Sequence, residues 1–134
     1  MEISQIEWLL RIAGAMLTGL VVANFVAAKR WKYAENLTSA SLIVRQIFYV
    51  HCAYIIAIIT ALAVLCLAWP HLLLTDGMGR IVAGFFAIFW LSRVIVQLSY
   101  YDAELRRIDR LWDVFFLLVF LTLAIIFTLA SYQP

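Results

Sequence analysis

The chain has 134 residues, of which 66% are hydrophobic and 13% charged, and its formal net charge is +2 at pH 7. An average soluble domain has about 45–50% apolar and about 25% charged residues, so this composition predicts an integral membrane protein. The length predicts a single domain, residues 1–134, and the small net charge excludes nucleic acid as a partner. Hydrocarbon satisfies no backbone polar group and the apolar runs lack barrel-strand alternation, so we expect an all-α, four-helix transmembrane bundle.

The first predicted span covers about residues 8–28. Small residues recur in it at a spacing of four, and they share one helix face: Ala15, Gly19, Ala23 and Ala27. Such a face lets another helix approach closely. It therefore predicts close packing, self-association or contact with another membrane subunit. Asn24 lies beside this face and can hydrogen-bond across the interface.

A basic loop leads to the second predicted span, about residues 46–69, which ends before Pro70. His51 is the ionisable side chain inside this span, and a lone histidine in a membrane helix is more often a hydrogen-bonding partner than a ligand. We predict no metal site. His51 as an axial haem ligand is the alternative, although bis-histidine ligation needs a second histidine at similar depth, and His71 lies at the far end of the span.

A short loop with the turn signal Asp76-Gly77 joins this span to the third, about residues 81–101, and predicts that the two are antiparallel neighbours. Arg93, Gln97 and Tyr100 follow one another at three or four residues, so they lie on one face of the third helix. An arginine near the middle of a bilayer costs about 2.5–3.5 kcal/mol on insertion scales. We therefore expect this face to point into the protein.

The fourth predicted span, about residues 111–132, has Asp113 as its charged residue. This carboxylate is the best-placed partner for Arg93 after the arginine side chain extends toward the interface, and Asp102 is the second. An Arg93–Asp113 pair would lock two helices together. In the other interpretation, Arg93 binds an anionic group of a ligand.

A short similarity relates the first and third spans: RIAG begins at Arg11 and RIVAG at Arg80, with Asn24 and Arg93 each 13 residues later. If it reflects a repeat, the chain consists of two hairpins.

Basic residues gather in two of the loops, Lys29, Arg30, Lys32 and Arg45 in the first and Arg106, Arg107 and Arg110 in the third. The positive-inside rule places both loops in the cytoplasm, so we expect up-down-up-down topology with both termini on the non-cytoplasmic side. The expected location is a bacterial-type inner membrane or a plasma membrane. Counted from the cytoplasmic boundary, Asn24, His51, Arg93, Gln97 and Asp113 lie about 3–12 Å deep, all in one leaflet.

We therefore predict a polar site in the cytoplasmic half of the bundle that contains Arg93, His51, Asn24, Gln97, Tyr100 and Asp113. The first hypothesis is that it binds an amphipathic or anionic ligand such as a lipid, or a partner subunit for which this chain is an accessory. A redox subunit that holds haem or quinone with His51 and Arg93 is the alternative, and an oligomeric channel or transporter is the second. No nucleophile–base pair, phosphate-binding glycine loop, HExxH or CxxC motif occurs, so an ordinary enzyme is not expected.

Overall fold

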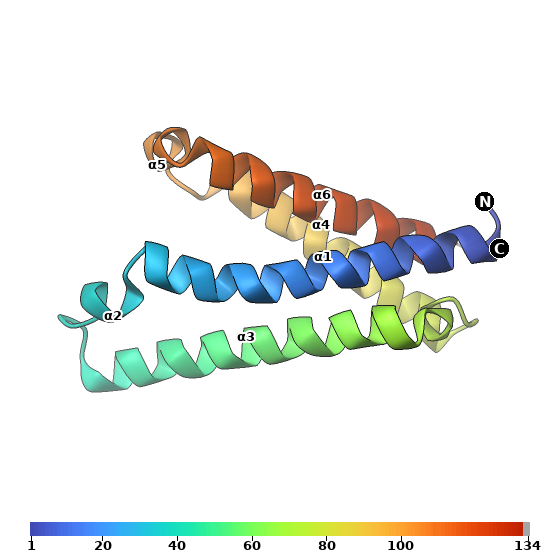
Figure 1. Cartoon of the computed structure of the whole chain (residues 1–134), viewed down its shortest axis with the longest axis horizontal. Helices are drawn as coiled ribbons and strands as arrows, with labels where there is room; N and C mark the ends of the chain where they lie inside the picture. The colour runs from blue at the N-terminus through green and yellow to red at the C-terminus, as the bar shows by residue number, and fades with distance from the viewer. Residues whose placement is uncertain (133–134) are drawn as a thin grey trace.

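The computed structural model describes residues 1–132 as a bundle of helices (Figure 1). Within this range there is no strand, and the elements in chain order are α1 (Ile3–Arg30), α2 (Tyr33–Asn36), α3 (Leu42–Ala68), η1 (Pro70–Leu73), α4 (Met78–Ser99), α5 (Ala103–Ile108) and α6 (Arg110–Ser131). Four of these helices, α1, α3, α4 and α6, are long and apolar enough to cross a membrane. The predicted helical, multi-pass membrane architecture is confirmed to this extent. The last two residues of the predicted domain, 133–134, lie outside the described range.

Each predicted span corresponds to one long helix, and the largest difference is at the start of α1. This helix begins at Ile3 rather than near residue 8, because the Gln5 side chain accepts a hydrogen bond from the backbone N–H of Glu2 (2.9 Å) and caps the first turn. At the predicted turn before α4, Gly77 has a φ of 74°, a conformation that glycine adopts without a steric penalty.

The four long helices form two antiparallel pairs. The chain crosses the length of the bundle four times, so the start of α1 and the end of α6 lie at one end with η1, and α2 and α5 lie at the other (Figure 1). α1 packs along α3, α4 packs along α6, and contacts between α1 and α6 join the two pairs. This arrangement agrees with the two hairpins suggested by the short sequence similarity.

The expected packing of the second span against the third is wrong. Both α3 and α4 pack on η1, but their principal partners are α1 and α6, respectively. The connection includes a 3-10 turn, Pro70–Leu73, with Pro70 and Leu73 both buried, and it carries the chain from one hairpin to the other. A short connection limits how far apart two helix ends lie, but it does not make the helices pack along their length.

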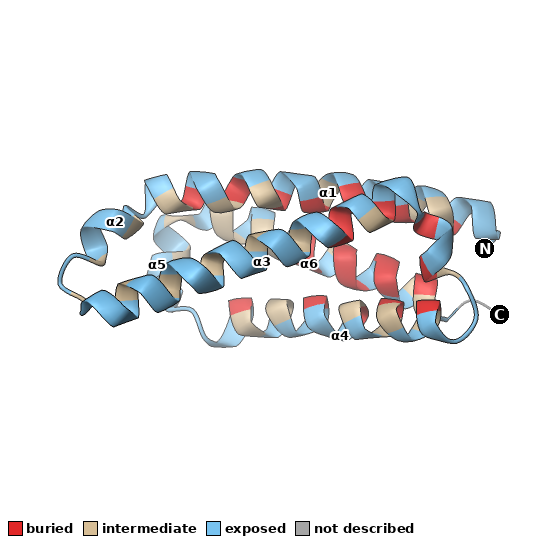
Figure 2. Ribbon diagram, turned by 90° about the horizontal axis from the view of Figure 1, so that it is seen from below, coloured by how far each residue is buried: buried red, intermediate tan, exposed pale blue. Residues whose placement is uncertain are grey.

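The two hairpins are close together at the η1 end and separate toward the α2 and α5 end (Figure 1). On α3 the buried residues, Leu62, Ala63 and Cys66, all lie in the last third of the helix (Figure 2). At the same end, a Cβ atom added to Gly14 on α1 would lie 2.7 Å from Cγ of Leu67, so α1 and α3 approach closely there. The bundle is therefore tight at one end and open at the other.

The predicted small-residue face of α1 is divided between two environments. Ala23 and Ala27 are buried, each 7% exposed, whereas Ala15 and Gly19 are exposed, and a Cβ on Gly19 would meet nothing within 4 Å. The close approach of α3 uses Gly14 instead, because the helix is rotated so that this position faces α3. Among the four small residues, packing inside the monomer therefore involves Ala23 and Ala27, and association with another chain through this face stays a prediction.

Candidate functional site

The open end of the bundle contains a cavity of about 770 Å³, within the usual range for small-molecule sites. All four long helices contribute to its wall. Its lining residues are Leu20, Ala23, Asn24, Ala27, Trp31, Tyr33, Ile55, Ile59, Phe89, Trp90, Arg93, Gln97, Tyr101, Leu105, Arg106, Asp109, Trp112, Asp113, Phe116 and Phe120. The set is largely apolar and aromatic, with the charged and amide side chains drawn mainly from α4, α5 and α6.

Arg93 lies on the cavity wall with its guanidinium carbon 5.1 Å from the ring centroid of Phe120 on α6. This cation–π contact fixes the position of the charge without neutralising it. Within residues 1–132, no carboxylate lies within salt-bridge distance of Arg93, so the predicted ion pair with Asp113 is wrong. Asp113 and Phe120 are seven residues apart on α6, so about 10 Å of helix separates the carboxylate from the ring on which Arg93 rests.

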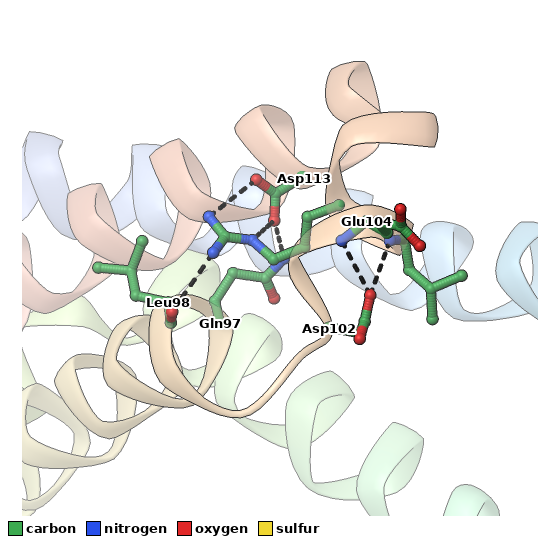
Figure 3. A network of polar contacts seen from close by, with 7 residues as sticks. Gln97, Leu98, Asp102, Glu104 and Asp113 are labelled. Atoms are coloured by element: carbon green, nitrogen blue, oxygen red, sulfur yellow. Dashed lines mark hydrogen bonds and ion pairs between the residues drawn. The ribbon is translucent and has the colours of Figure 1, made fainter.

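Asp113 is instead occupied by Arg106 and Gln97. Arg106 donates from Nε to Oδ1 (2.9 Å) and from Nη2 to Oδ2 (3.2 Å), and Gln97 donates from Nε2 to Oδ1 (2.6 Å). Figure 3 shows Gln97 and Asp113 pointing toward one another from α4 and α6. The Asp113 side chain is 12% exposed, and its hydrogen bond with Arg106 raises the pKa of the Arg106 guanidinium. The charge of Asp113 is therefore matched before any ligand binds.

Asp102, the second predicted partner of Arg93, has a structural role. One oxygen of its carboxylate accepts hydrogen bonds from the backbone N–H groups of Glu104 (2.8 Å) and Leu105 (3.2 Å) (Figure 3). It therefore acts as the N-cap of α5, which turns the chain so that Arg106 reaches the start of α6.

A second carboxylate on the cavity wall, Asp109, is also paired. It forms an ion pair with Arg30 at the end of α1, and Nε1 of Trp31 donates to its Oδ2 (3.4 Å). The hydrogen bond from Arg30, supported by the one from Trp31, lowers the pKa of Asp109. With both lining carboxylates matched, Arg93 is the unneutralised charge among the described residues of the cavity wall.

Aromatic rings form one continuous wall of the cavity. Trp90, Phe120, Phe116 and Trp112 stack in succession, with centroid separations of 5.6, 5.9 and 5.8 Å between neighbours. Because three of these rings come from α6 and one from α4, the stack holds the second hairpin together. It presents a rigid apolar surface beside the Arg93 guanidinium.

Two further predicted residues are at the site. Gln97 is buried at 8% exposure, and Asn24 lies on the opposite wall, where its Nδ2 donates to the backbone oxygen of Leu20 (2.8 Å). With Arg93 and Asp113, four of the six predicted site residues therefore line one cavity.

The other two predicted residues, His51 and Tyr100, do not line it. His51 is exposed on α3, its Nδ1 lies 2.8 Å from the backbone oxygen of Ile47, and no described residue of the cavity wall is a histidine. Tyr100 is 81% exposed, and its neighbour Tyr101 lines the cavity instead. Tyr100 is the C-cap of α4 and its N–H still donates to the backbone oxygen of Val96 (2.9 Å), so it lies at the very end of the helix, about 10 Å along the axis from Arg93. Across residues 1–132, no three His, Cys, Asp or Glu side chains gather where they could hold a metal ion.

Three further residues of the cavity wall, Arg106, Asp109 and Trp31, are not predicted from the sequence, because the folding of α5 over the start of α6 has no local sequence signal. Arg106 and Asp113 are seven residues apart, which is two turns of a continuous helix, and this spacing is the sequence feature that could have indicated their ion pair.

Comparisons with known protein families, with curated proteins and with solved structures find no match for this chain.

Proposed function

We propose that this chain is a small multi-pass membrane protein whose cavity binds an amphipathic molecule through an anionic group held by Arg93. The observation that carries the proposal is that Arg93 lies on the wall of a largely apolar cavity with no carboxylate partner, while the nearby carboxylates Asp109 and Asp113 are already paired. A charged guanidinium surrounded by apolar side chains is costly, and an anion beside it offsets that cost.

The guanidinium is suited to this role because it donates two parallel hydrogen bonds to a carboxylate or a phosphate. Phe120 supports one face of the group at 5.1 Å. Apolar residues of α1 and α3, among them Leu20, Ile55 and Ile59, line the same cavity and suit a hydrocarbon portion. The wall therefore offers one site for a charge and a large surface for a chain or ring.

We further propose that the end carrying α2 and α5 faces the cytoplasm of a bacterial-type inner membrane or a plasma membrane. Support comes from the two basic loops, which lie at this same end of the bundle (Figure 1). The test uses single cysteines at Glu104 and Asp76 in a Cys52→Ser, Cys66→Ser background, labelled in intact cells with a membrane-impermeant maleimide. Labelling at position 76 alone supports the orientation, and labelling at position 104 alone reverses it.

The binding test compares Arg93→Gln with Arg110→Gln, because Arg110 is exposed and does not line the cavity. Native mass spectrometry in mild detergent measures binding of dodecyl phosphate, with dodecanol as the uncharged reference. Loss of a charge-assisted hydrogen-bonded contact is expected to weaken dodecyl phosphate binding about tenfold or more in Arg93→Gln and to leave Arg110→Gln unchanged. Equal binding by both variants and the unaltered chain would overturn the proposal.

A quinone-binding redox subunit is the second candidate, and the stacked wall of Trp90, Phe120, Phe116 and Trp112 favours it, since a flat ring can lie against it. Arg93 would then donate to a quinone carbonyl. The position of His51 gives no support to haem ligation in the cavity. Organic extraction of the purified protein and an optical spectrum test this candidate, and absence of both a quinone and a Soret band rejects it.

Two other candidate functions, an accessory role beside a partner subunit and an oligomeric channel or transporter, depend on contact with another chain rather than on the cavity. The exposed half of the small-residue face, Ala15 and Gly19, is the surface available for a second helix. Native mass spectrometry of the same preparation distinguishes these cases, because a monomer with a bound small molecule supports the first proposal, whereas a stable oligomer supports a channel or transporter.

A further inference from the structure

At the α2 and α5 end, the two hairpins are joined across the cavity by a cluster that we call the end lock: Arg30, Trp31, Asp109 and Trp112. Arg30 pairs with Asp109, Trp31 donates to the same carboxylate, and the rings of Trp31 and Trp112 meet edge to face at 6.2 Å. The Arg30 guanidinium also lies 5.9 Å from the Trp112 ring. These contacts join the end of α1 to the start of α6 between the cavity and the basic end of the bundle.

The side of the cavity between α3 and α4 has no comparable cluster among the described residues. The two helices pack on different partners, α1 and α6, and share η1 at the far end. One lining side chain on each helix is exposed, Ile55 on α3 at 51% and Phe89 on α4 at 39%. Figure 2 shows α3 exposed along most of the length that crosses this side. Since α3 and α4 are candidate membrane spans, the opening between them faces acyl chains.

We infer that the ligand is a bilayer lipid with a small anionic headgroup, a phosphate monoester or a carboxylate, and that it enters sideways between α3 and α4. This inference rests on the proposed function and specifies its ligand class and route. Arg93 lies on α4, inside the span, so the headgroup has to leave the interface and lie beside apolar side chains. Arg93 can pair with a small anionic headgroup and offset its lost hydration, whereas the cationic group of a zwitterionic headgroup finds no free carboxylate there, because Asp109 and Asp113 are already paired. The acyl chain remains in the membrane or against Ile55 and Ile59 throughout.

The opening provides a matched pair of variants on α3. Ile55→Trp places a large side chain on the cavity wall beside the opening, whereas Ile58→Trp makes the same change at a residue that is 58% exposed and does not line the cavity. The unaltered chain, both variants and Arg30→Gln, which breaks the Arg30–Asp109 pair of the end lock at a residue outside the cavity lining, are reconstituted in phosphatidylcholine vesicles. Pyrene-labelled phosphatidic acid is added from separate vesicles of the same phosphatidylcholine, and energy transfer from tryptophan is followed in time.

The expected result is that Ile55→Trp slows the rise in energy transfer about tenfold, equivalent to about 1.4 kcal/mol of barrier, while Ile58→Trp and Arg30→Gln leave it unchanged. Phe89→Ala, which widens the opening from α4, is expected to accelerate it. Glycerol 3-phosphate, which has the same phosphate monoester without acyl chains, is expected not to compete.

The inference is overturned if Arg30→Gln accelerates binding while Ile55→Trp and Phe89→Ala leave it unchanged, or if glycerol 3-phosphate competes as well as phosphatidic acid. Either result would show that the ligand enters the cavity from the aqueous phase rather than from the bilayer. Arg93→Gln separates this failure from failure of the proposed function. If Arg93→Gln binds as the unaltered chain does, the site itself is wrong, whereas reduced binding with an unaffected Ile55→Trp variant rejects only the route.

Discussion

Arg106 holds Asp113 in a two-point ion pair, Nε to Oδ1 at 2.9 Å and Nη2 to Oδ2 at 3.2 Å, across the corner between α5 and α6. Gln97 donates to the same carboxylate from α4, so three elements meet at this group. The pairing has a direct consequence for Arg93, since the nearest acidic residue expected for it is already engaged.

A double-mutant cycle distinguishes this arrangement from an Arg93–Asp113 pair. Arg106→Gln and Asp113→Asn are each expected to lower the free energy of unfolding, and the double variant is expected to lose less than the sum, because both remove the same contact. Arg93→Gln combined with Asp113→Asn is expected to be additive. Denaturant unfolding in mixed micelles measures both cycles, and coupling in the second with additivity in the first would contradict the structure.

The close approach of α1 and α3 predicts opposite responses to one substitution at two glycines. A Cβ at Gly14 would lie 2.7 Å from Cγ of Leu67 and 3.1 Å from Cβ of Cys66, so Gly14→Ala is expected to destabilise the protein by about 1–3 kcal/mol. Gly19→Ala meets nothing within 4 Å and is expected to be neutral or stabilising by up to about 1 kcal/mol through helix propensity. Thermal unfolding in one detergent compares the two, and equal losses would place the helix contact elsewhere.

Arg11 is expected to stabilise the tight end of the bundle. Its Nη1 donates to the backbone oxygen of Leu67 (2.7 Å), one of the last carbonyls of α3, which have no partner within the helix. Because Arg11 is exposed, Arg11→Gln is expected to cost about 1 kcal/mol of unfolding free energy, and Arg11→Lys less. Equal stability of all three proteins would show that the contact contributes nothing.

The end lock is expected to open in acid. Arg30 lowers the pKa of Asp109 below its ordinary value near 3.9, so the native state releases this proton more readily than the unfolded chain. The pair therefore contributes fully above that ordinary value, and its contribution is lost as the pH falls through the lowered pKa. Tryptophan fluorescence, which reports on Trp31 and Trp112, should change below about pH 4 in the unaltered chain, and this change should be absent in Asp109→Asn.

His51 is expected to have no effect on the cavity. It is exposed on α3 and does not line the wall, so His51→Leu should leave binding of dodecyl phosphate within about twofold of the unaltered chain, whereas Arg93→Gln should not. The same native mass measurement tests both variants. A large loss of dodecyl phosphate binding in His51→Leu would show that His51 contributes to the binding site.

The features that depend on local composition can be predicted from the sequence. Apolar runs long enough to cross a bilayer set the long helices, and charged or turn-forming segments set their ends to within a turn or so. The deep arginine, Asn24 and Gln97 fall at similar distances from the basic loops, so their meeting at the wall of one cavity follows from counting residues along helices.

Which side chains face one another depends on how the helices pack, and this could not be predicted from the sequence. Helical periodicity places Arg93 and Tyr100 on one face of α4, but it does not show that the cavity wall uses Tyr101, while Tyr100 at the helix end is 81% exposed. The lengths of the loops do not show that α3 packs along α1. No sequence feature of α5 indicates that Arg106 forms an ion pair with Asp113. A span's rotation about its axis is set by packing against other helices, here by Gly14 and the aromatic stack, and that packing left Arg93 as an unpaired charge beside a cavity.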